Sequence, residues 1–276
     1  MVIFMEQYKK YFNTNLKRWN ELVKINAKSE FYDLEGFKAG KTSLLSIEKE
    51  ELTDVKGKTL LHLQCHFGMD TLSWAREGAK VTGVDFSESA TQLAKTLSKE
   101  LDIPATFIHS NIYDLPKVLK TTFDIIFTSY GVIGWLPDLS KWAQIIDTFL
   151  KPGGIFYIVE NHPFGNLIDE KYKEEFRIGY DYFNEGQPYR FDDEVPYAKT
   201  DEKIVNKTTY DWFHPMQDIV NSLLNVNFEL LFLHEFPFSF FQIHPDMKRR
   251  KDGYWEFQTF KHSIPMIFSL KARKKK

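Results

Sequence analysis

The sequence predicts an α/β fold with a doubly wound, seven-stranded sheet that is mostly parallel and carries helices on both faces. Two observations lead to this prediction. Short apolar runs alternate with helical stretches from residue 59 to residue 160, which is typical of parallel strands joined by crossover helices. Two later strand-like runs are separated by a variable loop without a helical pattern, which indicates a C-terminal antiparallel hairpin.

The composition of the chain indicates a folded protein with a large core and excludes several other classes of protein. The 276 residues are 43% apolar and carry a formal net charge of −2, so a large core can form. The single cysteine, Cys65, excludes an internal disulfide and fits a reducing compartment. No apolar run reaches the roughly 18 residues of a membrane span, and the N-terminal pattern is not that of a secretory signal. We therefore expect a cytoplasmic protein without a membrane partner, as a monomer or homodimer.

Two basic runs, at 248–251 and at the C-terminal end, are the only concentrated positive charge. We interpret both as solvated surface, because the chain as a whole is close to neutral. A nucleic-acid partner is therefore disfavoured.

The first 58 residues predict a helical and aromatic cap ahead of the main domain, 59–276. Apolar residues recur at helical spacing from residue 5 to residue 26. An aromatic loop with glycines at Gly36 and Gly40 follows. Thr42 or Ser43 is placed to cap a short helix that runs through Leu52.

Strands and helices then follow in order. The predicted strands are 59–63, 80–85, 105–110, 123–129, 155–160, 228–235 and 263–272. Predicted helices are 69–77, which Gly78 ends, a long one capped by Ser87, 139–149, and 216–224, which Pro215 opens. The KPGG turn at 151–154 stops the third helix.

Residues 161–207 interrupt the pattern and predict an insertion. Between Asp169 and Glu202 there are 11 acidic and 5 basic residues, with aromatic residues between them. Long irregular segments in compact domains are often functional, so we expect a lid over the ligand edge of the sheet. A surface loop without function is the alternative.

The loop after the first strand lies where open α/β sheets bind ligands. In the stretch LLHLQCHFGMD, Gly68 is the only glycine. A dinucleotide site needs G-x-G-x-x-G for its pyrophosphate. A dinucleotide is therefore disfavoured.

Four motifs between 59 and 160 resemble those of class I, Rossmann-like S-adenosylmethionine-dependent methyltransferases. Residues 61–68, LHLQCHFG, are similar to the family's LDLGCGTG, with histidine and glutamine in place of the acid and two glycines. Asp85 closes VTGVD, 17 positions after Gly68. The stretch HSNIYDLP resembles GDAxxLP, and FDIIFTSYGVIGWLPDL followed by LKPGG is similar to the fourth motif.

The resemblance implies a cofactor site for S-adenosylmethionine, with S-adenosylhomocysteine as product and no metal. Asp85 would accept hydrogen bonds from the ribose hydroxyls, and Phe86 would cover the adenine. The other implied cofactor residues are His62, Gln64, His66, Gly68, Asp70, Asn111, Ile112, Thr128 and Ser129. We expect the side chains of Gln64 and His66 to turn away from the ribose.

Candidate catalytic residues are Tyr130, His162 and His214. Tyr130 and His162 follow the fourth and fifth strands, at the carboxyl edge. His214 shares a face with Tyr210 and Trp212 if TYDWFHP is extended; the alternative is that Trp212 belongs to the core and His214 caps a helix. Histidine titrates near neutrality, although in-line methyl transfer depends mainly on alignment and does not always need a base.

The leading hypothesis is methyl transfer to a small-molecule acceptor. An RNA methyltransferase is disfavoured because the acidic insertion would repel phosphates. A different class is a catalytically silent binding or regulatory protein of the same fold, and Gln64 and His66 are the residues that favour it.

Overall fold

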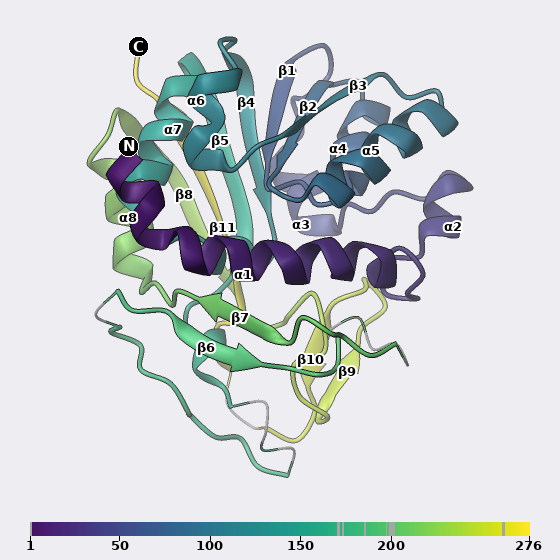
Figure 1. The fold of residues 1–276 in the computed structure, drawn as a ribbon, viewed down its shortest axis with the longest axis vertical. Coiled ribbons are helices and arrows are strands. Elements are labelled where there is room, and N and C mark those ends of the chain that lie inside the picture. Colours follow the sequence, from purple (N-terminus) through teal and green to yellow (C-terminus); the bar gives the residue numbers. More distant parts are fainter. Residues whose placement is uncertain are drawn as a thin grey trace.

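The computed structural model describes residues 2–169, 172, 174–184, 186–196, 198, 202–260 and 263–276. Its centre is a seven-stranded sheet in the order β3-β2-β1-β4-β5-β11-β8 (Figure 1). These strands are β1 (Thr59–Leu63), β2 (Lys80–Asp85), β3 (Ala105–His109), β4 (Phe123–Ser129), β5 (Leu150–Asn161), β8 (Phe228–Phe236) and β11 (Ile267–Lys274). β1 to β5 pair in parallel, and β11 pairs antiparallel with both β5 and β8. The predicted fold class is confirmed, including the C-terminal antiparallel hairpin.

Helices cover both faces of this sheet, and α1 crosses its carboxyl edge (Figure 1). The helices of the described residues are α1 (Val2–Asn26), α2 (Leu34–Lys38), α3 (Ser46–Glu51), α4 (Met69–Arg76), α5 (Glu88–Glu100), α6 (Leu115–Val118), α7 (Leu139–Phe149) and α8 (Met216–Leu224). On one face Trp142 of α7 and Leu223 of α8 join the core with Ile126 of β4, and on the other Trp74 of α4 packs with Phe127. The period-2 alternation of β4 thus sends neighbouring side chains into two different cores.

Several predicted boundaries hold and three shift, one of them that of the last strand, which is Ile267–Lys274 rather than 263–272. Ser87 is the N-cap of α5 and accepts a hydrogen bond from the Ala90 N–H at 3.1 Å. The short helix of the cap begins only at Ser46, after the proposed caps. The fifth strand begins at Leu150 rather than at residue 155, because the KPGG segment forms an irregularity where the register against β4 shifts.

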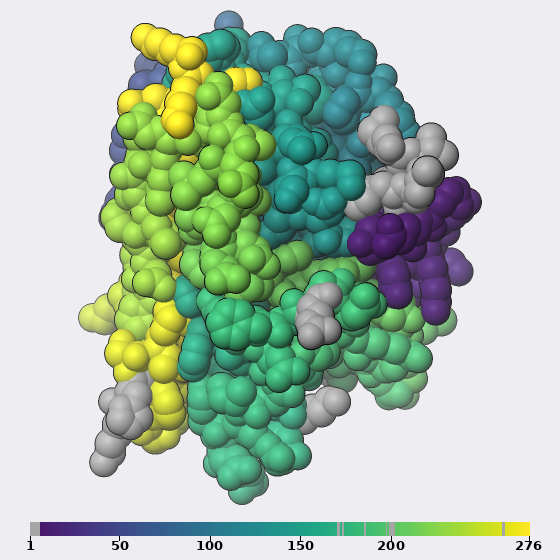
Figure 2. All heavy atoms as spheres, turned by 90° about the vertical axis from the view of Figure 1, so that its left-hand side faces the viewer, coloured from purple at the N-terminus to yellow at the C-terminus, as the bar shows by residue number. Residues whose placement is uncertain are grey.

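The predicted insertion, 161–207, contains more structure than its sequence indicated. It includes a short 3-10 helix, η3 (Gly165–Leu167), and a strand, β6 (Tyr189–Asp192), which pairs with β7 (Thr208–Asp211). Residues 170, 171, 173, 185, 197 and 199–201 of this prediction lie outside the described residues. Figure 2 shows the green residues of the insertion on the lower part of one face, below the yellow-green residues of α8 and β8.

A second small hairpin, β9 (Met247–Arg249) with β10 (Trp255–Phe257), lies in the connection between β8 and β11. Both hairpins lie beyond the carboxyl ends of the parallel strands, together with α1 (Figure 1). Among the helices in the described part of the chain, none combines the length and the apolar character needed to cross a bilayer.

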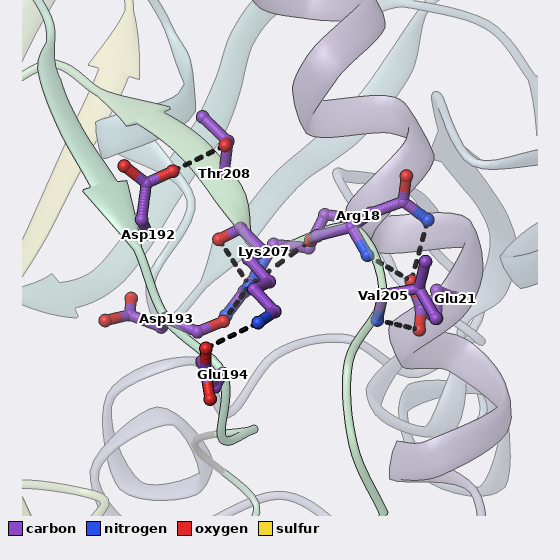
Figure 3. A network of polar contacts seen from close by, with 9 residues as sticks. Arg18, Glu21, Asp192, Asp193, Glu194, Val205, Lys207 and Thr208 are labelled. Atoms are coloured by element: carbon purple, nitrogen blue, oxygen red, sulfur yellow. Dashed lines mark hydrogen bonds and ion pairs between the residues drawn. The ribbon is translucent and has the colours of Figure 1, made fainter.

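Helix α1 is hydrogen-bonded to the insertion and to β7. Asn15 exchanges two hydrogen bonds with the Tyr210 backbone, at 2.8 and 2.9 Å. Arg18, only 6% exposed, donates to the carbonyls of Asp193 and Lys207, both at 2.8 Å (Figure 3). The Glu21 carboxylate accepts from the backbone N–H groups of residues 205 and 206. The proposed division into a cap, 1–58, and a main domain, 59–276, stays a prediction, but these contacts cross it.

Candidate functional site

The loop after β1 takes a glycine-type path through residues that are not glycine. Gln64 and His66 have φ values of 57° and 51°, in the left-handed region, and Gly68 has 81°. A Cβ at Gly68 would lie 2.6 Å from the Phe107 ring, so this position requires glycine. A left-handed conformation costs a residue with a Cβ about 1–2 kcal/mol, so the packing around Gln64 and His66 must offset that cost.

Contacts of the two side chains supply that packing. The Gln64 amide donates to the Val132 carbonyl at 3.0 Å. The His66 ring lies 5.4 Å from the Trp19 ring of α1 and 5.3 Å from the Tyr32 ring. Each side chain is therefore held by a segment outside the loop.

One polar atom on each of these side chains remains unpaired. Gln64 Oε1 and His66 Nε2 are buried and have no hydrogen-bond partner among the described residues. Burial lowers the pKa of His66 to about 3, so the imidazole is neutral at physiological pH. Buried polar atoms without a partner are uncommon, so these two atoms are candidates for contact with a polar ligand of the loop.

Asp85 ends β2 beside this loop and is 6% exposed. Its two carboxylate oxygens accept from the backbone N–H groups of His66 and Ser87, both at 2.8 Å. Burial raises the pKa of Asp85 to about 6, against the effect of these two N–H groups. Each oxygen keeps a second lone pair for a ligand hydroxyl.

A polar chain of side chains lies at the ends of β1 and β4. The Ser129 hydroxyl donates to Asp70 at 2.9 Å and lies 3.3 Å from His62 Nε2. His62 Nδ1 lies 2.8 Å from the Thr71 hydroxyl. Burial lowers the pKa of His62 to about 3 and raises that of Asp70. Thr128 points to the opposite face, as the alternation of β4 requires, and its hydroxyl has no partner in the described structure.

The residues predicted near the adenine lie at the ends of β2 and β3. Asn111 caps the 3-10 helix η1 (Ile112–Asp114) and accepts from the Tyr113 N–H at 3.0 Å through its side-chain oxygen. Ile112 is buried and Phe86 is half-buried. The side-chain oxygen of Asn111, a predicted cofactor residue, therefore already accepts a hydrogen bond within its own turn.

Tyr130, directly after β4, reaches a buried acid that sequence reasoning missed. Its hydroxyl donates to Glu48 of α3 at 2.9 Å and lies 3.3 Å from the Tyr254 hydroxyl. Glu48 is 0% exposed, and burial, followed by the charge of Asp70, raises its pKa to about 7. A charged residue in the stretch SIEKEE resembles ordinary helix surface, so no sequence signal distinguishes it.

Glu160, at the end of β5, fixes the loop that follows Tyr130. Its carboxylate accepts from the backbone N–H groups of residues 131, 132, 133 and 161. Burial raises the pKa of Glu160, and these four N–H groups oppose that shift. The position of Tyr130 is thus held from both sides, by Ser129 and by this loop.

The two candidate catalytic histidines have other partners. His162 accepts from the Phe164 N–H through Nδ1, at 3.0 Å, and its Nε2 lies 2.7 Å from Glu235. His214 Nε2 lies 2.7 Å from the Leu136 carbonyl, and the residue lines a cavity of about 340 Å³ between the start of α7, the insertion and α8. Of the three catalytic candidates, Tyr130 is the one that lies next to the predicted cofactor site. The residue before it, Ser129, is bonded to Asp70, and Val132, two residues after it, is bonded to Gln64 of the β1 loop.

The region from β1 to β5 is similar to a known protein family. Residues 61–158 match a family model described as a methyltransferase domain. The chain is 28% identical over 134 residues to a ubiquinone biosynthesis O-methyltransferase of Proteus mirabilis, covering 49% of this chain and 51% of that protein. It is 30% identical over 148 residues to the Vibrio cholerae protein of the same name, covering 51% and 60%. The match thus spans about half of the length of these curated relatives.

Solved structures share the fold over most of the chain. An S-adenosylmethionine dependent methyltransferase from Mesorhizobium loti has a TM-score of 0.59 at 20% identity, over 82% of this chain and 95% of that one. An S-adenosylmethionine-dependent methyltransferase from Clostridium acetobutylicum has a TM-score of 0.56 at 14% identity, over 91% and 95%. At such identities the likeness shows the fold alone.

Proposed function

We propose that this chain, which contains a class I S-adenosylmethionine-dependent methyltransferase domain, transfers a methyl group from S-adenosylmethionine to a small-molecule acceptor. The observation that carries the proposal is the β1 loop. It keeps the left-handed backbone path at Gln64, His66 and Gly68 and places the Asp85 carboxylate directly beside it. This geometry supports nucleoside binding although two glycines have been replaced.

Residues on either side of the loop would hold the parts of the cofactor. Asp85 would accept from the ribose hydroxyls, and Phe86, Asn111 and Ile112 would contact the adenine. The methionine end would lie towards Asp70, beyond Gly68. His62 and Ser129 would complete that end, whereas Thr128, whose side chain points to the opposite face, would not contact the cofactor. The bound cofactor supplies an electrophilic methyl group on a sulfonium.

The acceptor would bind beyond the carboxyl edge, next to Tyr130. Tyr130 packs against Phe240 with ring centroids 4.4 Å apart, so an aromatic surface adjoins the polar one. The curated relatives named O-methyltransferases support a small organic acceptor. We assign no catalytic role to His162 or His214 within this proposal, because protein groups already engage both nitrogens of the first and one of the second.

The test is calorimetric titration of the protein with S-adenosylmethionine, followed by a screen for formation of S-adenosylhomocysteine with small molecules and with RNA. The proposal expects binding, and turnover with a small molecule. Absence of binding by the folded chain would refute it.

Affinity for the cofactor should depend on pH through Asp85. The pKa of its buried carboxyl is about 6, so the carboxylate that accepts the ribose hydrogen bonds is lost as pH falls below that value. We expect affinity to be constant from pH 7 to 8 and to fall by up to about tenfold per unit below pH 6. Titrations across this range check it, and an Asp85→Asn variant should lose the pH dependence.

A second candidate function, a catalytically silent protein of this fold, is favoured by one observation. Trp19 and Tyr32 pack on the His66 ring at the place where the cofactor would approach. If the protein is catalytically silent, the β1 loop would have lost its affinity for the cofactor, and the N-terminal segment would cover it.

Restoring both glycines distinguishes the two candidates. The double variant Gln64→Gly, His66→Gly relieves the left-handed strain but removes the contacts with Val132, Trp19 and Tyr32. If the loop works as it stands, we expect cofactor affinity to fall or to change less than about tenfold. A gain of about a hundredfold in a calorimetric titration would favour the silent protein, since it would show that the native side chains block the site.

A further inference from the structure

We propose that Glu48 is a positioning residue that acts through Tyr130 to take up the proton of a hydroxyl acceptor during methyl transfer. This inference rests on the function proposed above and specifies the acceptor class. Methyl transfer forms a bond between the acceptor oxygen and the methyl carbon and breaks the carbon–sulfur bond of the sulfonium. The acceptor proton passes to the Tyr130 oxygen, and the Tyr130 proton passes to the Glu48 carboxylate.

The geometry places the pair at the boundary between core and ligand edge. Glu48 has no exposed surface, whereas Tyr130 is half-buried. The residue before Tyr130 is bonded to Asp70 at the start of α4, and Val132, two residues after it, accepts from Gln64 of the β1 loop. The residues on both sides of Tyr130 along the chain therefore contact the predicted cofactor site, and the Tyr130 hydroxyl itself contacts the buried Glu48.

Groups from three elements and from the loop before β10 surround the Glu48 carboxyl, besides Tyr130. The Leu45 N–H, from the start of its own helix, donates at 2.6 Å to the oxygen that does not contact Tyr130. Asp70 of α4 and Tyr157 of β5 interact with it electrostatically, and Tyr254 lies behind Tyr130. Among the described residues, none of the groups that interact with the Glu48 carboxyl is a cation.

This environment brings the pKa of Glu48 close to neutral pH, so both its protonated and its ionised forms are populated there. Burial raises the pKa of Glu48 to about 7, and the negative charge of Asp70 adds to that effect. Above this pH the carboxylate accepts the Tyr130 proton, and below it the acid is already protonated and cannot. A base with a pKa close to the working pH is the most effective in general base catalysis.

The chain provides a matched control on the same helix. Glu51 accepts from the Tyr157 hydroxyl at 2.8 Å, so it also forms a glutamate–tyrosine pair. Tyr157 lies within β5, where it pairs with Phe127, and not at the carboxyl edge. Its pair should therefore contribute to structure but not to the transfer of a proton from the acceptor.

The experiment compares wild type, Glu48→Gln, Tyr130→Phe and Glu51→Gln. Rates of S-adenosylhomocysteine formation are measured from pH 5 to 9 with phenol and with 4-nitrophenol, and thermal denaturation confirms folding. Phenol keeps its proton over most of this range, whereas 4-nitrophenol is largely ionised at pH 8 and needs no base. Wild type should show a rate with phenol that rises through about pH 7.

With phenol at pH 8, we expect Glu48→Gln and Tyr130→Phe each to lose about tenfold or more in rate and the rise near pH 7. With 4-nitrophenol both variants should stay close to wild type, as should Glu51→Gln with either acceptor. Equal losses with the two phenols, or an unchanged pH profile, would overturn the inference, and so would a wild type that binds S-adenosylmethionine but methylates neither phenol. Absence of S-adenosylmethionine binding would instead refute the proposed function itself.

Discussion

Replacing Asp85 by alanine should weaken S-adenosylmethionine binding by about 30-fold to 1000-fold, which corresponds to about 2–4 kcal/mol for two lost hydrogen bonds to a charged group. Asp85 is the carboxylate beside the β1 loop, and its position is fixed by the backbone N–H groups of His66 and Ser87. The variant therefore loses the ribose acceptor and also one anchor of the loop. Both losses act in the same direction on affinity.

Calorimetric titration of Asp85→Ala against wild type measures this effect. Glu88→Ala is the matched control, because Glu88 is an exposed acid three residues further along the chain and its loss changes the net charge equally. The control should bind as wild type does. An Asp85→Ala variant that stays folded and binds with wild-type affinity would remove the central residue from the proposed site.

Replacing Arg18 by methionine should lower the free energy of unfolding by about 3–5 kcal/mol, the range measured when one partner of a buried charged contact is removed. The guanidinium donates to two carbonyls of the insertion at 2.8 Å, and Asp193, Asp211 and Glu21 offset its charge. Methionine keeps much of the apolar stem but leaves the two carbonyls without their donor and the carboxylates without the neighbouring positive charge (Figure 3).

Urea denaturation of Arg18→Met checks the expected loss. Lys17→Met, on the exposed side of the same helix, provides the control and should change stability by no more than about 0.5 kcal/mol. A change below 1 kcal/mol for Arg18→Met would show that the insertion is held to α1 by other contacts. Limited proteolysis of residues 193–207 should report the same loosening.

The parallel part of the fold was predictable because burial on both faces dictates it locally. Strands 59–63, 80–85 and 123–129 match the observed ones residue for residue, since each is a short apolar run bounded by turn residues. The pairs β6–β7 and β9–β10 were missed. Their strands have only three or four residues, which is too short for an alternating pattern to stand out.

The candidate site also contains residues that the sequence predicts and residues that it does not. Asp85 could be predicted because its place at the end of a strand follows from spacing alone. The left-handed backbone of Gln64 and His66 could not, since it is held by tertiary contacts that the local sequence does not show, with Val132, Trp19, Tyr32 and Asp85. Glu48 illustrates the limit most clearly, because its burial results from the packing of α3 against distant parts of the chain, including the hydrogen bond from Ile47 to Tyr254.

The attachment of α1 to the insertion also sets an order of events on the ribosome. Asn15 and its partner Tyr210 are separated by 195 residues, which take about 10–40 s to translate at roughly 5–20 residues per second. During that time Leu22 and Ile25 of α1 lack their partner Ile204, whereas Val23 of the same helix can already pack with Phe67 and Phe107. Docking of α1 is thus complete only after the insertion and β7 have been synthesised, and until then its partly uncovered apolar face is open to contact with other chains.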